Sequence, residues 1–138
     1  MRTITIMPDY GGACCWWSDG SDSENRCWVG AFGGLPRIRI GTKLRTNPLE
    51  EDFSAWQSDF EAMDCSPSAW AKFDLRAFHR EGMRLARKLK RQQGERFRVV
   101  YEKPCEDPGH RNNERREVLS DGSTKLLRSR AEIRQLTQ

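Results

Sequence analysis

Polar and apolar residues alternate at the start of the chain, and this pattern predicts a short strand. At residues 2–7, Ile4 and Ile6 alternate with polar neighbours, as in a strand with one buried face. The pattern breaks at Pro8-Asp9-Tyr10-Gly11, where proline and glycine favour a turn. Residues 26–32 and 35–40 are also predicted to be strands, joined into a hairpin through Gly33-Gly34.

Two helical patterns follow. Asn47-Pro48-Leu49-Glu50 supplies a capping residue, a proline in the first turn and an acid three residues after the cap, and this helix is expected to end near Asp64. A second, longer helix is expected to begin at Pro67 or Asp74 and to end at Gln93, with Gly94 as its C-terminal cap. The apolar stripes of the two helices are Leu49, Phe53, Trp56, Phe60 and Met63, and Leu75, Phe78, Gly82, Leu85, Ala86 and Leu89.

The rest of the chain predicts further strands. Phe97, Val99 and Tyr101 alternate with arginines, and residues 103–114 are expected to form a loop. A hairpin around Ser120-Asp121-Gly122-Ser123, with a type I′ turn, is expected to precede a short terminal helix capped by Ser129. The sequence therefore predicts an α+β fold. Its sheet is small and largely antiparallel, two amphipathic helices pack on it, and a basic C-terminal extension carries the hairpin and the short helix.

Length and charge refine this picture. The chain of 138 residues fits one compact unit, which we divide into an α+β domain at 1–102 and a basic extension at 103–138, packed on the same domain. Residues 1–69 carry 6 Lys/Arg and 10 Asp/Glu, whereas residues 70–138 carry 18 and 10. The C-terminal half is thus expected to attract an anionic partner. The sequence shows no secretory signal or membrane span, and its five cysteines favour reduced thiols in the cytoplasm.

Four features of the first hundred residues form a recognisable set. They are Pro8-Asp9-Tyr10-Gly11 with Trp16 or Trp17 soon after, a helix bearing Trp56, the Gly82–Leu89 segment, and Val99-Val100-Tyr101. In these features the chain resembles a group of small, uncharacterised bacterial proteins. The resemblance implies a similar α+β arrangement and carries no activity to this chain. The chain departs from that group at Cys14-Cys15, directly before the tryptophans, and in the basic tail after residue 103.

Metal binding and catalysis find little support in the sequence. The cysteines and the two histidines form no Cys-x-x-Cys or His-x-x-x-His pair, so we predict neither a metal nor another cofactor. A cysteine nucleophile would require Cys14 or Cys15 to lie near His79. Because His79 follows a core phenylalanine on an arginine-rich helix, it is expected at the edge of the solvated face. We therefore predict no enzymatic activity.

Two kinds of partner fit the charge pattern. Residues 76–98 contain nine Lys/Arg and only two glutamates. This excess of positive charge favours nucleic acid as a partner, although no established nucleic-acid-binding motif is present. The first hypothesis is that this chain is an inhibitor, immunity or counter-defence factor and binds another protein with an acidic surface. Tryptophan and arginine, which the chain would use, are residues that anchor protein interfaces. Nucleic acid is the alternative, membrane binding is not expected, and the oligomeric state is left open. The residues predicted to bind a partner are Trp16, Trp17, Arg80, Arg84, Arg87, Lys88 and Arg91.

Overall fold

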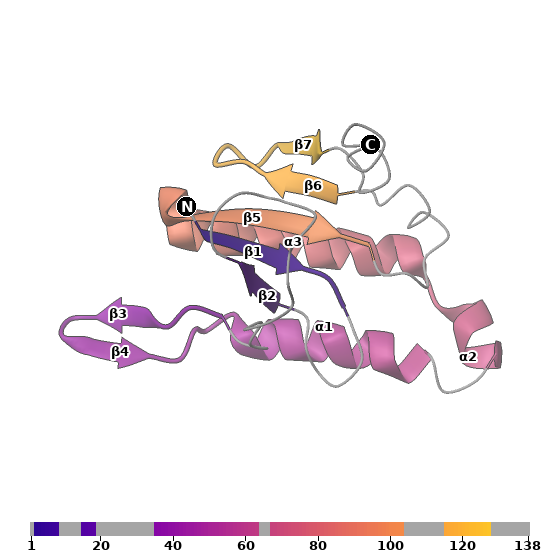
Figure 1. Ribbon diagram of the computed structural model, residues 1–138. Coiled ribbons are helices and arrows are strands. Elements are labelled where there is room, and N and C mark those ends of the chain that lie inside the picture. Colours follow the sequence, from indigo (N-terminus) through magenta and orange to yellow (C-terminus); the bar gives the residue numbers. More distant parts are fainter. Residues whose placement is uncertain (1, 9–14, 19–34, 64–66, 104–114, 128–138) are drawn as a thin grey trace.

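The computed structural model describes residues 2–8, 15–18, 35–63, 67–103 and 115–127. Five strands form the main sheet in the order β2-β1-β5-β6-β7 (Figure 1). They are β1 (Arg2–Ile6), β2 (Cys15–Ser18), β5 (Phe97–Glu102), β6 (Arg115–Val118) and β7 (Thr124–Leu127). A separate two-stranded sheet consists of β3 (Ile38–Ile40) and β4 (Lys43–Arg45).

One pairing in the main sheet is parallel. β1 runs parallel to β5, with Ile4 opposite Val99 and Ile6 opposite Tyr101, whereas β2, β6 and β7 each pair antiparallel with their neighbour. A parallel pair needs a long crossover connection, and here the helices lie between its two strands in sequence. The prediction of an α+β fold with a largely antiparallel sheet is confirmed.

The helices are α1 (Glu50–Met63), the short α2 (Pro67–Lys72) and α3 (Leu75–Gln93). The Oδ1 atom of Asp74 accepts a hydrogen bond from the N–H of Ala77, so the long helix begins after Asp74. Asn47 Oδ1 likewise accepts from the N–H of Leu49, before α1. Glu50 does not complete a capping box, because its Oε1 accepts from the N–H of Leu35 at 3.1 Å.

The two long helices enclose the core together with one face of the sheet. α3 packs on β5, and α1 packs on α3. Trp56 of α1 stacks on Phe78 of α3 with ring centroids 4.5 Å apart, and its Nε1 donates to the carbonyl of Phe78 at 2.9 Å. From the sheet, the core receives Ile4, Ile6, Phe97, Val99, Tyr101 and Val118. The prediction of two amphipathic helices packed on the sheet is confirmed.

The other face of the central strands is also buried. The alternate residues Thr3, Thr5 and Val100 are at most 1% exposed. Glu102 and Arg115 lie opposite each other on β5 and β6, both fully buried, with Arg115 Nε 3.9 Å from Glu102 Oε2. A charged pair therefore lies within the sheet, on the side away from the helices.

The described residues contain one hairpin that the sequence did not predict and one whose turn differs from the prediction. Residues 38–40 pair with 43–45 around Gly41, whose φ is 65°, whereas the partner expected for this strand, residues 26–32, lies outside the described residues. The β6–β7 hairpin is confirmed, but its turn is not type I′. The N–H of Gly122 bonds to the carbonyl of Leu119, and Gly122 follows this turn with a φ of 88°, as in hairpins with a glycine bulge.

Some expectations fall outside the description. These are the loop over 104–114, the terminal helix from Ser129, and most of Pro8-Asp9-Tyr10-Gly11. The division between 1–102 and 103–138 stays a prediction. The strands of the β6–β7 hairpin nevertheless extend the sheet of the N-terminal part through β5.

Candidate functional site

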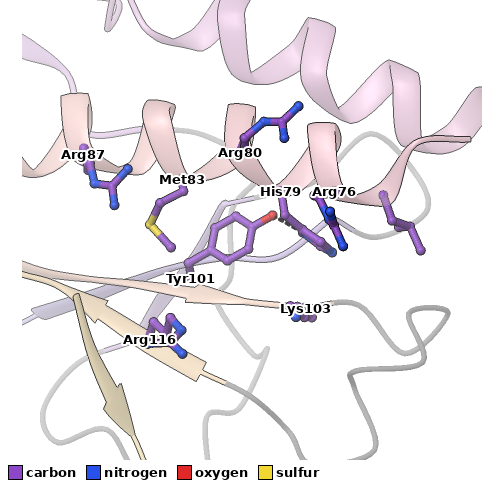
Figure 2. Close-up of a pocket in the computed structure, with 9 residues that line it drawn as sticks. Arg76, His79, Arg80, Met83, Arg87, Tyr101, Lys103 and Arg116 are labelled. Carbon is purple, nitrogen blue, oxygen red and sulfur yellow. Dashed lines mark hydrogen bonds between the residues drawn. The ribbon is translucent and has the colours of Figure 1, made fainter. Parts of the chain in front are cut away.

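A pocket of about 700 Å³ lies between α3 and the ends of β5 and β6 (Figure 2). We call it the basic pocket. Its volume falls in the range usual for ligand sites. It is lined by Leu75, Arg76, His79, Arg80, Met83, Arg87, Tyr101, Lys103 and Arg116.

The helical side of the pocket follows from the period of α3. Arg76, Arg80, Met83 and Arg87 recur at spacings of three and four residues, which places them along one stripe of the helix. The buried stripe, which includes Phe78, lies beside this one and packs on the core. The pocket stripe therefore runs along the border between the core and solvent.

The sheet contributes three residues through its register. Tyr101 and Lys103 are two residues apart along β5 and its extension, and residues with this spacing share a face of a strand. Arg116 of β6 is the register partner of Tyr101, and directly paired residues also share a face. Antiparallel pairing thus brings Arg116 to the same side of the sheet as Tyr101.

The charged side chains among the described residues that line the pocket all carry positive charge. Five of its lining residues are cations, and none of the described residues that line it is a carboxylate. Arg76 and Arg80 are exposed and form no ion pair with the described part of the chain. Arg87 is anchored differently, because its Nε donates to the carbonyl of Gly122 at 2.8 Å. Cations gathered in a concave site raise the local concentration of anions.

Two residues that line the basic pocket, a histidine and a tyrosine, are hydrogen-bonded to each other. His79 Nδ1 lies 2.6 Å from the hydroxyl of Tyr101, and the two rings are perpendicular. Tyr101 is 4% exposed, and Trp56 packs near its ring, with centroids 6.1 Å apart. Whichever atom carries the shared proton, this bond orients the imidazole at the edge of the pocket (Figure 2). His79 is thus half-buried, in keeping with the position expected at the edge of the solvated face, and it is bonded to a core residue.

The structure divides the predicted basic residues of α3 into two groups. Arg80 and Arg87 line the basic pocket, whereas Arg84, Lys88 and Arg91 do not. Arg84 binds Glu81 with its Nε 2.8 Å from Oε2. This hydrogen bonding lowers the pKa of Glu81 and raises the pKa of Arg84 from their ordinary values.

Lys90, another basic residue of α3, is buried. Its Nζ donates to the carbonyls of Gly94 and Phe97, at 2.9 and 2.7 Å. The cation therefore satisfies backbone oxygens at the end of α3. Lys90 therefore contributes no charge to the exposed face of α3.

The two predicted tryptophans lie on β2. Trp16 is the register partner of Thr5, and Trp17 is the register partner of Ile4. Their backbones thus extend the sheet beside β1, away from the basic pocket in strand order. Their predicted role in a protein interface stays a prediction.

Sequence reasoning missed most of the sheet side of the pocket. The pairing of Tyr101 with Arg116 depends on the register of two strands separated by residues 103–114, and no local pattern gives that register. The sequence gives a weak indication for Lys103, because it lies two residues after Tyr101 and such residues share a face of a strand. Arg76 belongs to the predicted basic helix but is not among the residues predicted to bind a partner.

The described residues contain no group of three or more metal-ligating side chains. They also contain no helix long and apolar enough to span a membrane. A second pocket of about 470 Å³ lies on the other side of α3 and is lined by aromatic rings and by Asp59, Asp74 and Glu81. Two of these acids are engaged, Asp74 by the N-terminus of α3 and Glu81 by Arg84.

Comparison of the chain with protein-family models, with curated proteins and with solved structures gave no match.

Proposed function

We propose that the protein binds nucleic acid and that the basic pocket holds phosphate groups of the backbone. The observation that supports this proposal most directly is the convergence of five cations from α3, β5 and β6 on one pocket whose described lining has no carboxylate. Four of the five are arginines, whose planar guanidinium groups match phosphate oxygens in bidentate geometry. The cytoplasm is the compartment that we propose for this activity, on the sequence grounds given above.

The remaining lining suits a nucleotide as well. Leu75, Met83 and the ring of Tyr101 give the pocket an apolar part beside its cations. His79, oriented by Tyr101, adds a group able to donate a hydrogen bond to a phosphate oxygen. An acidic protein is the second candidate, since its carboxylates would meet the same cations, and the experiment below separates the two.

The test compares two double variants that remove the same charge from the same helix. Arg76→Gln/Arg80→Gln removes two of the positive charges that line the pocket. Lys88→Gln/Arg91→Gln is the matched control, because it removes two positive charges of the same helix that do not line the pocket. Binding to fluorescent single-stranded and duplex oligonucleotides is measured between about 0.05 and 0.3 M salt. On duplex DNA, each lost phosphate contact reduces the slope of log affinity against log salt concentration by about 0.9. The pocket variant is therefore expected to lose about 30-fold in affinity for the duplex near 0.15 M salt.

The control variant is expected to lose less than about threefold, because a salt concentration near 0.15 M screens charges beyond roughly 8 Å. Equal losses in the two variants would show that the whole basic helix attracts the ligand without a defined site. Absence of wild-type binding near 0.05 M salt would exclude nucleic acid. A protein partner would then be sought by comparing what nuclease-treated lysate leaves on the wild type and on the pocket variant.

A further inference from the structure

The β3–β4 hairpin stands apart from the other strands and helices that the structure describes. Its two strands pair with each other around Gly41 and, within the described residues, with no other strand. In Figure 1 the hairpin extends away from the sheet and helices, beyond the start of α1. An isolated two-stranded ribbon is only marginally stable in water.

The side chains of this hairpin are unusual for an exposed ribbon. Arg37, Arg39, Lys43 and Arg45 are all exposed, and residues 35–47 contain no acid. Two large aliphatic side chains are exposed beside them, Ile40 at 62% and Leu44 at 56%. Among the described residues, only one other large hydrophobic side chain, Leu126, is exposed to a similar extent.

The register mixes the two kinds of side chain on both faces. Ile38 is paired with Arg45 and Ile40 with Lys43, whereas Arg39 is paired with Leu44 on the opposite face. Neither face is a purely apolar surface that a second copy of the chain would cover. Pairing two such hairpins would also bring like charges together, which is unfavourable.

We propose that the β3–β4 hairpin is an arm that enters the major groove of duplex DNA. The major groove of B-form DNA admits a two-stranded ribbon, and apolar side chains there contact the methyl group of thymine. Cations on both faces of the ribbon would then meet the phosphates on both sides of the groove, while Ile40 near the tip faces base edges. This inference rests on the proposed function, since it assigns a second contact to a protein that binds nucleic acid through the basic pocket.

An arm that enters the major groove should distinguish duplex DNA from duplex RNA and from a single strand. The major groove of A-form RNA is deep and narrow, and side chains do not read it. A groove-entering arm therefore contributes to the binding of duplex DNA and contributes little to duplex RNA or to a single strand. A hairpin that acted only through its positive charge would contribute to the binding of duplex DNA, duplex RNA and a single strand alike.

The experiment measures the affinity of the full chain for these three ligands, with identical sequence and length. The charge variant is Arg39→Gln/Lys43→Gln, and Lys88→Gln/Arg91→Gln is its control. Near 0.15 M salt, the charge variant is expected to lose about 30-fold on duplex DNA, with a salt slope smaller by about 1.8. The expected loss on duplex RNA and on the single strand is below about threefold.

The apolar contact is tested separately with Ile40→Ser, and with Leu126→Ser as a matched exposed control. Ile40→Ser is expected to weaken duplex DNA binding about fivefold without changing the salt slope, because it removes no charge. Leu126→Ser is expected to leave binding unchanged. Circular dichroism confirms that each variant is folded.

The results that overturn the arm differ from those that overturn the proposed function. If the pocket variant loses affinity and the hairpin variants do not, the arm is wrong and the proposed function stands. Equal losses on DNA and RNA duplexes also overturn it, as does hairpin-dependent binding to vesicles of anionic lipid without binding to duplex DNA. If the wild type binds no nucleic acid near 0.05 M salt, both proposals fail.

Discussion

Gly82 is the residue on which the packing beneath the basic pocket depends. A Cβ atom at this position would lie 2.5 Å from Cζ2 of Trp56 and 2.7 Å from the hydroxyl of Tyr101. Both rings are buried in the core, so neither can move aside freely. The absence of a side chain at Gly82 lets α3 approach β5 closely, and this approach brings His79 within hydrogen-bonding distance of Tyr101.

We predict that Gly82→Ala lowers the free energy of unfolding by about 1–3 kcal/mol, the usual cost of overpacking a core. On helix propensity alone, the same change would raise this free energy by about 1 kcal/mol. The sign of the effect, measured by urea denaturation, therefore separates the two. An increase in stability would show that the rings give way and that the close approach is not required.

At the scale of the elements, β5 and β6 are joined by two pairs of opposite charge in different surroundings. Arg115 and Glu102 are fully buried, whereas Arg98 and Glu117, whose atoms Nη2 and Oε1 are 3.0 Å apart, keep 23% and 16% of their side chains exposed. Removing one partner of a buried pair leaves a charge without compensation, which is costly. Removing one partner of a more exposed pair costs little, because water solvates the other.

We predict that Arg115→Met lowers the free energy of unfolding by about 3–5 kcal/mol, while Arg98→Met lowers it by about 1 kcal/mol. The double variant Glu102→Leu/Arg115→Met is expected to recover part of the first loss, since it leaves no buried charge. Chemical denaturation of the three variants and of the wild type measures these differences. A double variant less stable than Arg115→Met alone would contradict this account.

The helices were predictable because their signals are local. Asp74 and Gly94 act at the ends of α3 where the sequence indicates, and the apolar stripe of α1 is buried as its spacing predicts. Strand pairing was less predictable, because it depends on contacts between distant segments. Residues 38–40 pair with β4, which follows them after the turn at Gly41 and which no local signal predicts. Their predicted pairing with residues 26–32 lies outside the described residues and stays a prediction.

The candidate site was only half predictable for the same reason. Arg80 and Arg87 belong to a helix whose basic face is evident from the sequence. Their separation from Arg84, Lys88 and Arg91 follows from what packs beside each part of the helix, which the sequence does not show. Lys90 illustrates the limit, because its charge satisfies carbonyl groups at the helix end rather than facing solvent.

At the scale of the whole molecule, the basic pocket and the β3–β4 hairpin belong to different parts of the fold. The pocket is built on α3, β5 and β6, and the hairpin precedes α1 (Figure 1). Sites that share no residues contribute independently to binding. Removing charge from both should therefore multiply the two losses on a duplex long enough to reach both surfaces.

We predict that the variant combining Arg76→Gln/Arg80→Gln with Arg39→Gln/Lys43→Gln binds long duplex DNA roughly a thousandfold more weakly than the wild type near 0.15 M salt. Its salt slope should be smaller by about 3.6, the value expected for four lost phosphate contacts. Fluorescence anisotropy over a salt series measures both quantities. A combined loss no greater than that of either pair would show that the two surfaces do not engage one duplex together.

The parallel pairing of β1 with β5 also bears on how the chain folds during synthesis. β1 is complete at Ile6, but the strand that pairs with its inner edge begins only at Phe97. β1 thus leaves the ribosome before the helices are made and can pair with β5 only after them, and such non-local pairing is slow. During that interval its β-branched edge is open to other nascent chains, so slower translation of the helical region would favour aggregation over folding.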